Sequence, residues 1–146
     1  MKERVRKKRY GFTMVELMAM LIIIGLLATL VVTKVASKID QARVTTTKAN
    51  LKTLRDAVNQ FKMDTSRYPT EELGLLELVQ QPTDVQNWIP GGYLETSDIP
   101  KDGWGNDFVY RQYTETGQPF VILSYGADGE EGGEKLDADL KSTDAF

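Results

Sequence analysis

The longest hydrophobic segment of the chain lies close to its amino terminus. Residues 12–33 contain a single charged residue, Glu16, and follow a head rich in lysine and arginine. A helix rises about 1.5 Å per residue, so this segment would extend about 33 Å, enough to cross a hydrocarbon layer of about 30 Å. The pattern predicts the membrane-spanning half of a longer helix. A simple membrane anchor, however, does not need a carboxylate inside its apolar segment, because a charge there is costly and usually marks a function.

After residue 33 the hydrophobic pattern changes to that of an amphipathic helix. No proline or glycine interrupts the chain before Pro69, which disfavours helical angles at the residue before it and so predicts the end of the helix. Spacings of three and four residues separate the apolar positions of the second half, which places them on one face. These positions are Leu51, Leu54, Val58 and Phe61. We therefore expect one long helix whose second half covers a core.

The remaining residues predict a small sheet. Thr70 is a plausible amino-terminal cap for a short helix that extends to Val79. Two apolar segments, 108–113 and 119–125, flank a turn and predict an antiparallel hairpin, to which a short strand near the carboxyl terminus can add. We expect Trp104 to pack between helix and strands. The expected fold class is α+β, with the long helix packed on a small antiparallel sheet.

Composition limits both the size of the fold and its chemistry. With 146 residues, of which part is assigned to a membrane, about 110 remain for one small domain. The chain has no cysteine, so a bound metal is the first alternative to disulfides for holding its loops. It has no histidine either, which excludes catalytic triads and metal sites that depend on histidine.

Charge is divided between the head and the rest of the chain. Residues 1–11 hold six of the 18 basic residues and one of the 21 acidic ones, which leaves 12 basic and 20 acidic residues beyond them. A basic head before an apolar helix stays in the cytoplasm, so the acidic domain is expected on the other side of the membrane. Because nucleic-acid binding requires a basic folded surface, the sequence argues against that function.

The most acidic and glycine-rich segment is the loop 124–140, which follows the second strand. Hard cations such as calcium bind carboxylate and carbonyl oxygens, and glycines allow a backbone to turn its carbonyls inward. The spacing of the acids does not match an EF-hand. From the residues alone, a solvated acidic loop and a metal site are both open.

Residues Gly11 to Glu16, Gly-Phe-Thr-Met-Val-Glu, resemble the processing site of type IV pilin-like proteins. The resemblance implies that a dedicated peptidase cuts between Gly11 and Phe12 and methylates the new amino terminus at Phe12. It also makes Glu16 the fifth residue of the mature chain. The alternatives are an uncleaved anchor and a secretory signal, and the apolar segment is long for the latter.

Glu16 has a physical role if subunits pack side by side. A buried carboxylate at this depth costs about 2.5 to 3.5 kcal/mol, which the free amine of Phe12 on the next subunit would offset. Glu16 lies about 6 Å along the helix from Phe12, so pairing between chains requires an axial stagger of about one turn. A stagger that repeats in one direction builds an open helical filament.

The rest of the chain resembles the major pseudopilin of type II secretion systems, the G-type subunit, over nearly its whole length. The motifs that carry this resemblance are Tyr68-Pro69-Thr70, Gly74-Leu75, Gly92-Tyr93-Leu94, Pro100-Lys101-Asp102, Trp104-Gly105-Asn106 and Ser124-Tyr125-Gly126-Ala127-Asp128-Gly129. The resemblance implies calcium binding in the acidic loop. The implied ligands are the carboxylates of Asp128, Asp137 and Asp139 and the carbonyl of Tyr125. Gly103 and Asp107 depart from the family, which often has proline there, and this puts the rigidity of the turn in doubt.

The implied function is structural. Residues 1–11 would be a cleaved leader, 12–33 the transmembrane and filament-core helix half, and 34–146 a periplasmic domain. The mature subunit would be held in the inner membrane as a single-pass protein and polymerise to drive protein export across the outer membrane. Its implied partners are copies of itself, minor pseudopilins, the prepilin peptidase, the inner-membrane assembly platform, the ATPase, the secretin and the lipid bilayer.

Two other functions remain open at this point. The first is a type IV pilin or a minor pseudopilin in an adhesion or motility fibre, which would share the processing site. The second is a membrane-anchored hydrolase. Without histidine it would depend on carboxylates, and Asp128 with Asp137 could form an acid and base pair. No nucleophile with a base is evident in the sequence, so we expect no enzymatic activity.

Overall fold

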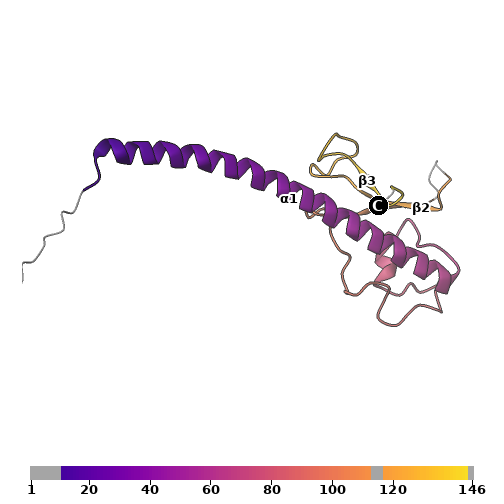
Figure 1. The fold of residues 1–146 in the computed structure, drawn as a ribbon. Coiled ribbons are helices and arrows are strands. Elements are labelled where there is room, and N and C mark those ends of the chain that lie inside the picture. The colour runs from indigo at the N-terminus through magenta and orange to yellow at the C-terminus, as the bar shows by residue number, and fades with distance from the viewer. Residues whose placement is uncertain (1–10, 113–116, 145–146) are drawn as a thin grey trace, which may run out of the picture. The chain divides into compact units, whose positions relative to one another are not determined.

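The computed structural model describes residues 11–112 and 117–144, and within α1 it leaves the side chains of residues 30–34 undescribed. Its elements are the helix α1 (Met14–Thr65), the 3-10 helix η1 (Gly74–Leu78) and three strands, β1 (Val109–Gln112), β2 (Phe120–Ser124) and β3 (Leu140–Lys141) (Figure 1). This confirms the expected α+β class with a long amino-terminal helix and a small antiparallel sheet. The chain divides into two compact units, Met1–Lys38 and Ile39–Phe146, and each is described by itself below.

The long helix ends close to where the sequence predicts. Ser66 follows α1 with a φ of 63°, in the left-handed region, and its N–H donates to the carbonyl of Lys62 at 2.9 Å. Pro69 comes three residues later and prevents the helix from resuming directly. The expectation of one continuous helix up to this turn is therefore confirmed.

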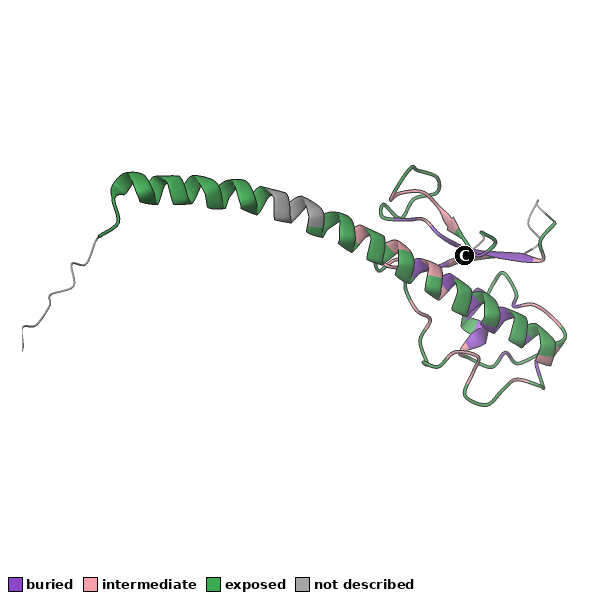
Figure 2. Cartoon of the chain, viewed as in Figure 1, coloured by how far each residue is buried: buried purple, intermediate pink, exposed green. Residues whose placement is uncertain are grey.

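The apolar stripe of α1 forms the centre of the core in the second unit. Leu51, Leu54, Val58 and Phe61 are all 0% exposed, as the spacing predicts. They pack in one cluster with apolar side chains of η1 and of the sheet, and Figure 2 shows this buried face in purple. Burial of this stripe holds the second half of α1 on its domain.

The sheet has the order β1-β2-β3, and both pairs of strands are antiparallel. Tyr110 is opposite Ile122 in the first pair, and Leu123 is opposite Lys141 in the second. β2 is buried along its whole length, because it lies between the other two strands and against the core. The hairpin and the short third strand are thus confirmed, while residues 113–116 of the expected turn lie outside the described residues.

Acidic side chains close hydrogen-bonding positions on the two outer strands. The N–H of Gln112 on β1 donates to Oε1 of Glu71 at 2.9 Å. The N–H of Lys141 on β3 donates to Oδ2 of Asp144 at 3.1 Å. Each carboxylate takes a backbone donor on an edge strand, where a neighbouring strand would otherwise provide the acceptor.

The segment after α1 differs from the expected helix over 70–79. Only Gly74–Leu78 is helical, and it is a 3-10 helix. The reason is Glu77, whose side chain is fully buried and pairs with Arg67 at 2.7 Å. The same carboxylate accepts hydrogen bonds from the N–H and the hydroxyl of Thr70. A buried carboxylate needs such partners, so these contacts fold residues 67–77 into a tight loop instead of a regular helix.

The tryptophan that anchors the core is Trp88, and the expectation for Trp104 is wrong. Trp88 packs against the core and donates its indole N–H to the carbonyl of Glu77 at 2.9 Å, and its ring lies 6.0 Å from that of Tyr93, edge to face. Trp104 is half-buried and is not part of the core cluster. The turn that carries Trp104 is held through its backbone, as described below.

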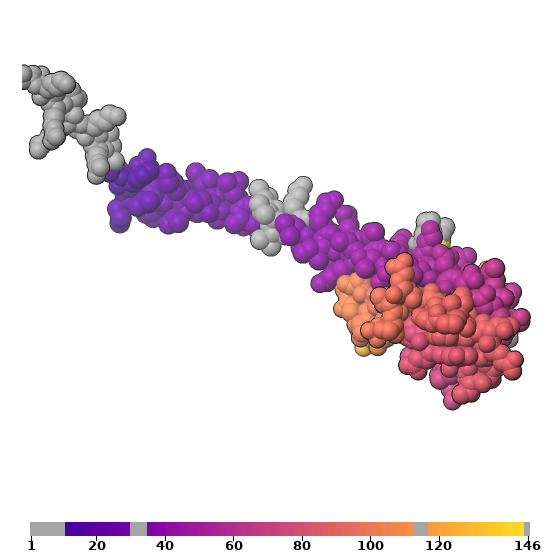
Figure 3. All heavy atoms as spheres, turned by 90° about the horizontal axis from the view of Figure 1, so that it is seen from below, coloured from indigo at the N-terminus to yellow at the C-terminus, as the bar shows by residue number. Residues whose placement is uncertain are grey.

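In the first unit, the described side chains of α1 are exposed. All residues from 11 to 29 are exposed and are green in Figure 2, and Figure 3 draws their atoms as indigo to purple spheres. They include large apolar side chains such as Phe12, 67% exposed, and Leu21, 69% exposed. No helix within the described residues combines the length and the hydropathy needed to cross a membrane. The expected span over 12–33 is therefore not found among them, and the side chains of its last four residues lie outside the description.

Candidate functional site

The predicted cleavage point lies just before α1. Gly11 and Phe12 are exposed and have no regular secondary structure, and α1 begins two residues later at Met14. Apart from its neighbours in the chain, no atom of the described residues lies within 4 Å of the position that a Cβ on Gly11 would occupy. The bond between Gly11 and Phe12 is thus accessible in this structure, as a peptidase substrate requires.

Glu16 caps the amino terminus of α1 together with Thr13. The N–H of Glu16 donates to the Thr13 hydroxyl at 3.2 Å, and the N–H of Thr13 donates to the Glu16 carboxylate at 3.4 Å. This reciprocal arrangement is a capping box, for which Thr-x-x-Glu is the sequence signal. The sequence analysis missed this local role. In this structure, Glu16 therefore stabilises the first turn of α1.

The acidic loop closes on itself at its base. The N–H of Ala127 donates to the carbonyl of Leu136 at 2.9 Å. Gly126 has a φ of 70°, and a Cβ there would lie 2.7 Å from the same carbonyl oxygen. Only glycine allows this approach, which explains one of the glycines that make the loop distinctive.

The structure does not bring the predicted carboxylates into one group. Oδ1 of Asp128 accepts the N–H of Glu130 at 3.1 Å, and Oδ1 of Asp139 accepts the N–H of Gly132 at 3.0 Å. Within the described part of the chain, no three acidic side chains lie together as a metal site. The side-chain and backbone donors that the loop offers are oxygens, which is the type of ligand that a hard cation such as calcium binds.

Arg111 of β1 contacts this loop from the sheet. It pairs with Glu131 at 3.3 Å and donates to the hydroxyl of Tyr125 at 2.9 Å. The hydrogen bond to Glu131, and then the nearby charges, raise the pKa of Arg111 above its ordinary value. The Tyr125 hydroxyl is thus held by Arg111 of β1. The predicted ligand of Tyr125 is its backbone carbonyl, which these contacts do not use.

A buried aspartate in the turn 102–106 joins the loop to the sheet. Asp102 is only 6% exposed. Its Oδ1 accepts the N–H groups of Trp104 and Asn106 at 2.9 and 2.8 Å, and its Oδ2 accepts the hydroxyl of Ser124 at 2.7 Å. Asn106 in turn donates to the carbonyl of Gly126 at 3.0 Å. The sequence indicated this turn only through the family motifs.

Gly103 attaches the same turn to α1. Its N–H donates to the hydroxyl of the fully buried Thr47 at 2.8 Å, and a Cβ at this position would lie 2.2 Å from the carbonyl oxygen of Arg43. Proline has no N–H and would not fit. Gly103 therefore makes a hydrogen bond that proline cannot make, and this bond attaches the turn to the helix.

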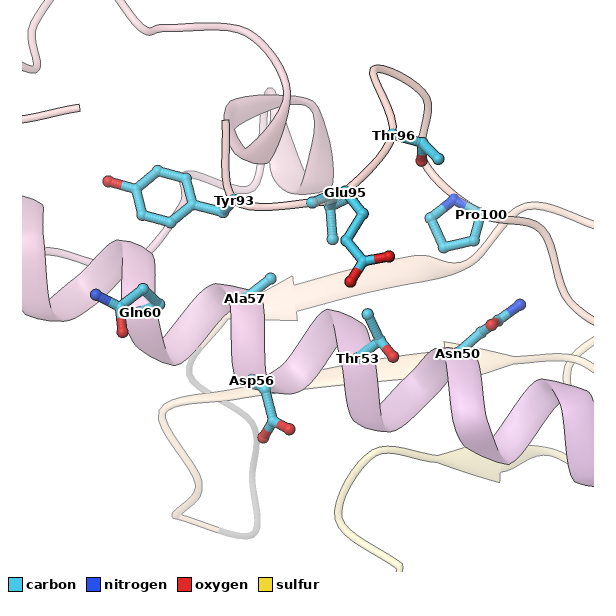
Figure 4. Close-up of a pocket in the computed structure, with 10 residues that line it drawn as sticks. Asn50, Thr53, Asp56, Ala57, Gln60, Tyr93, Glu95, Thr96 and Pro100 are labelled. Carbon is cyan, nitrogen blue, oxygen red and sulfur yellow. The ribbon is translucent and has the colours of Figure 1, made fainter. Parts of the chain in front are cut away.

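A groove of 610 Å³ lies between α1 and residues 93–100 (Figure 4). Its lining is mixed: Thr53 and Asp56 on the helix and Glu95 on the opposite segment are polar, while Ala57 and Leu94 are apolar. The side-chain amide of Asn50 donates to the carbonyl of Lys101 at 2.8 Å beside it. The residues that line the groove include no nucleophile paired with a base.

Comparisons with known proteins agree with this architecture. Residues 34–143 match the family described as "Type II secretion system (T2SS), protein G", and residues 6–32 match the "Prokaryotic N-terminal methylation motif". The chain belongs to the type II secretion system protein G family.

Relatives of this family span nearly the full chain. The type II secretion system core protein G of Pseudomonas aeruginosa is 42% identical over 142 residues, which cover 95% of this chain and 98% of that protein. The protein of the same name from Vibrio cholerae is 37% identical and covers 92% of this chain and 91% of its own.

A solved structure carries the same fold. It is the crystal structure of the major pseudopilin from the type 2 secretion system of enterohaemorrhagic Escherichia coli. Its TM-score is 0.61 at 29% identity, and the match covers 73% of this chain and 90% of that one. The expected family and fold are confirmed.

Family membership also decides between the functions that the sequence left open. A protein G family member is a structural pseudopilin, so the chain is a structural subunit of the type II secretion pseudopilus, and the type IV pilin alternative is not favoured. The family is non-enzymatic in character, which argues against the hydrolase built on Asp128 and Asp137. The methylation motif implies a processed, filament-forming subunit anchored at its amino terminus.

Proposed function

We propose that this chain is the major subunit of a type II secretion pseudopilus. It is made as a precursor, cut between Gly11 and Phe12 by a prepilin peptidase, and methylated on Phe12. Residues 12–33 hold it in the inner membrane, with the domain 34–146 in the periplasm. It polymerises with copies of itself and with minor pseudopilins on the inner-membrane assembly platform, and this growth drives folded proteins across the outer membrane.

One observation carries this proposal. The match to the methylation motif ends at residue 32 and the match to protein G begins at residue 34, so the two features adjoin in one chain. Exposure of Gly11 and Phe12 before the first turn of α1 supports the proposed cut between them. The basic head supports a cytoplasmic leader.

Mass spectrometry of the chain produced together with a prepilin peptidase tests the processing step. The wild type should lose residues 1–11 and gain one methyl group on Phe12. The Gly11→Val variant should remain uncut, because the added side chain occupies the cleavage position. Gly25→Val is the matched control and should be cut. An intact wild-type chain, or a cut at another bond, would contradict the proposed processing.

We further propose that the acidic loop binds calcium. The expected ligands are Asp128, Asp137, Asp139 and the carbonyl of Tyr125. Three features support the proposal: the oxygen-only donors, the closed base at Gly126 and the lack of cysteine for a disulfide. When bound, calcium would supply a cross-link between distant parts of the loop.

Thermal unfolding of the full chain in detergent tests the metal. A ligand that binds only the native state raises the unfolding midpoint once it exceeds its dissociation constant. The midpoint should rise on adding calcium to chelator-treated protein, more than on adding magnesium. Asp128→Ala should abolish the rise, while Glu130→Ala, a change of an exposed acid in the same loop, should keep it. If calcium does not raise the unfolding midpoint of the wild type, the proposal is contradicted and the loop is a solvated acidic segment.

A further inference from the structure

We propose that two surfaces of opposite charge on α1 join neighbouring copies of this chain. One is a cationic stripe on the domain half of the helix, and the other is the groove between α1 and residues 93–100, which carries carboxylates. The stripe of one copy binds the groove of the next. This inference rests on the proposed polymer and names the surfaces of the folded domain that meet in it. The cationic stripe consists of Lys48, Lys52, Arg55 and Lys62.

The cationic stripe repeats at helical spacing. Its first three members are separated by four and three residues, and Asn59 occupies the next place before Lys62 at the same spacings. Positions three and four apart are neighbours on a helix surface, so the stripe follows one flank of α1. Four of the 12 basic residues beyond residue 11 thus lie on this flank, although the acidic residues there number 20.

The contacts within one copy do not neutralise this stripe. Lys52 is exposed and forms no ion pair or hydrogen bond with the described residues. Arg55 donates to the carbonyl of Ser142 at 3.1 Å, and the ammonium of Lys62 lies 5.3 Å from the centre of the Tyr68 ring. Neither of these partners is a carboxylate. The stripe can therefore still bind an acidic surface of another molecule.

The groove of 610 Å³ offers such a surface (Figure 4). Carboxylates line it from both sides, Asp56 from the helix and Glu95 from the opposite segment, and its described lining includes no basic residue. Both acids are exposed, and neither forms an ion pair with the described residues. In Figure 4 the Glu95 carboxylate points toward α1. Ala57 and Leu94 add apolar surface against which the aliphatic part of a lysine can pack.

The stripe and the groove lie on different flanks of α1, and this determines the kind of assembly. Arg55 and Asn59 line a small pocket together with Phe120 and Ser142, on the side of the sheet, whereas the groove faces residues 93–100. A contact between stripe and groove therefore uses two different surfaces and leaves one of each free for a further copy. Such heterologous contacts build rings or open filaments, not closed two-fold dimers.

The loop 124–140 is the other acidic surface that a neighbouring copy presents. The groove fits the stripe better, because the helix residues that line it, 50–60, extend over nearly the same length as the stripe, and a concave surface accepts the side-chain ridge of a helix. In the loop, Glu131 is already paired with Arg111 at 3.3 Å. We therefore assign the groove, and the experiment includes the loop as the alternative.

Cross-linking between introduced cysteines tests the contact directly, because the chain has no cysteine of its own. Filaments of the full chain that carries both Lys52→Cys and Glu95→Cys are treated with a short bismaleimide. They should give a ladder of dimers, trimers and larger species on a denaturing gel, while each single variant should remain monomeric. Intact filaments that give no ladder would overturn the inference. A ladder from Lys52→Cys with Glu130→Cys in its place would also overturn it and assign the stripe to the loop.

Charge reversal tests whether the contact depends on these charges. Lys52→Glu and Glu95→Lys should each lower the amount of sedimented filament by about twofold or more, the effect of one exposed ion pair, and their combination should restore it. Lys141→Glu with Glu95→Lys is the control and should not restore it, since Lys141 is an exposed lysine of β3 outside the stripe. No loss in the single variants, or no recovery in the combination, would overturn the inference. A wild type that forms no filament would instead contradict the proposed polymer.

Discussion

Gly103 brings the turn 102–106 into close contact with α1. A Cβ at this position would lie 2.2 Å from the carbonyl oxygen of Arg43, and the flanking hydrogen bond to Thr47 leaves little room for the turn to move. The requirement for glycine here is steric, because no left-handed φ is recorded for Gly103. It reflects a contact between backbones that are distant in the sequence.

We therefore predict that Gly103→Ala lowers the free energy of unfolding by about 1 to 3 kcal/mol, the usual cost of overpacking. Gly103→Pro should cost more, since it also removes the donor to Thr47. Gly25→Ala is the control, because nothing lies within 4 Å of its Cβ position. Urea unfolding of the full chain in detergent measures the change. A stabilising Gly103→Pro would show that the contact with Arg43 is not maintained.

Tyr93 gives the fold a pH dependence in the alkaline range. Burial, with a smaller contribution from the charge of Asp64, raises the pKa of Tyr93 above its ordinary value. In the unfolded chain tyrosine ionises near pH 10. Between the unfolded and the folded pKa the unfolded state binds fewer protons, so stability is complete below the unfolded pKa and is lost as the pH rises through the folded one.

The expected result is that wild type and Tyr93→Phe respond differently to alkali. Above about pH 10 the wild type should lose stability faster than Tyr93→Phe, because phenylalanine cannot ionise. Urea unfolding of both proteins at neutral pH and at a series of alkaline pH values measures the difference. Parallel curves across the whole series would contradict the raised pKa.

At the scale of elements, the apolar stripe of α1 is the main attachment of the helix to its domain. Leu54 is 0% exposed within this stripe, whereas Met63, on the same helix, is 73% exposed. Leu54→Ala should cost about 2 to 5 kcal/mol, since it leaves a cavity among buried side chains. Met63→Ala should change stability by less than about 0.5 kcal/mol. Similar losses for the two variants would mean that the stripe does not form the core.

The elements that the sequence predicted well are those with a strong local pattern. The stripe Leu51 to Phe61 repeats at helical spacing, and the two longer strands are apolar segments bounded by turn residues. The end of α1 also carries a local signal, Pro69. These features depend on neighbours in the sequence, which is why a single sequence was enough to find them.

The features that the sequence did not give depend on contacts between distant residues. The bond between Asp102 and Ser124 spans 22 positions, and the one between Gly103 and Thr47 spans 56. The two tryptophans both lie in loops that contain glycine, and only the fold selects Trp88 for the core. The sequence also gives no sign that the charged Glu77 is buried, because its partner Arg67 lies ten residues earlier in the chain, outside the 3-10 helix.

At the scale of the whole molecule, assembly is expected to depend on Glu16. In this chain its carboxylate caps α1 together with Thr13. In the proposed filament it pairs with the amine that cleavage creates on Phe12 of a neighbouring subunit. The cap and the pair both use the carboxylate, but only the pair requires its negative charge, since a glutamine side chain can also serve in a capping box.

Glu16→Gln should therefore be processed normally and yet assemble poorly, because it keeps the cap and loses the charge. Sedimentation and electron microscopy of filaments from cells that overproduce the subunit measure assembly, and mass spectrometry confirms cleavage. Glu72→Gln, a change at an exposed glutamate of the folded domain, is the control and should assemble like the wild type. Full-length filaments from Glu16→Gln would contradict the charge pair.

The closed edges of the sheet have a consequence for a protein that works at high local concentration. When subunits are crowded, the outer strands of neighbouring subunits come close to one another. Unpaired strand edges are the usual starting point of amyloid-like aggregation. Here Glu71 and Asp144 occupy backbone donors of β1 and β3, and β3 is only two residues long. Recruitment of a foreign strand would have to displace these carboxylates first. We therefore expect these sheet edges to take no part in the contacts between subunits.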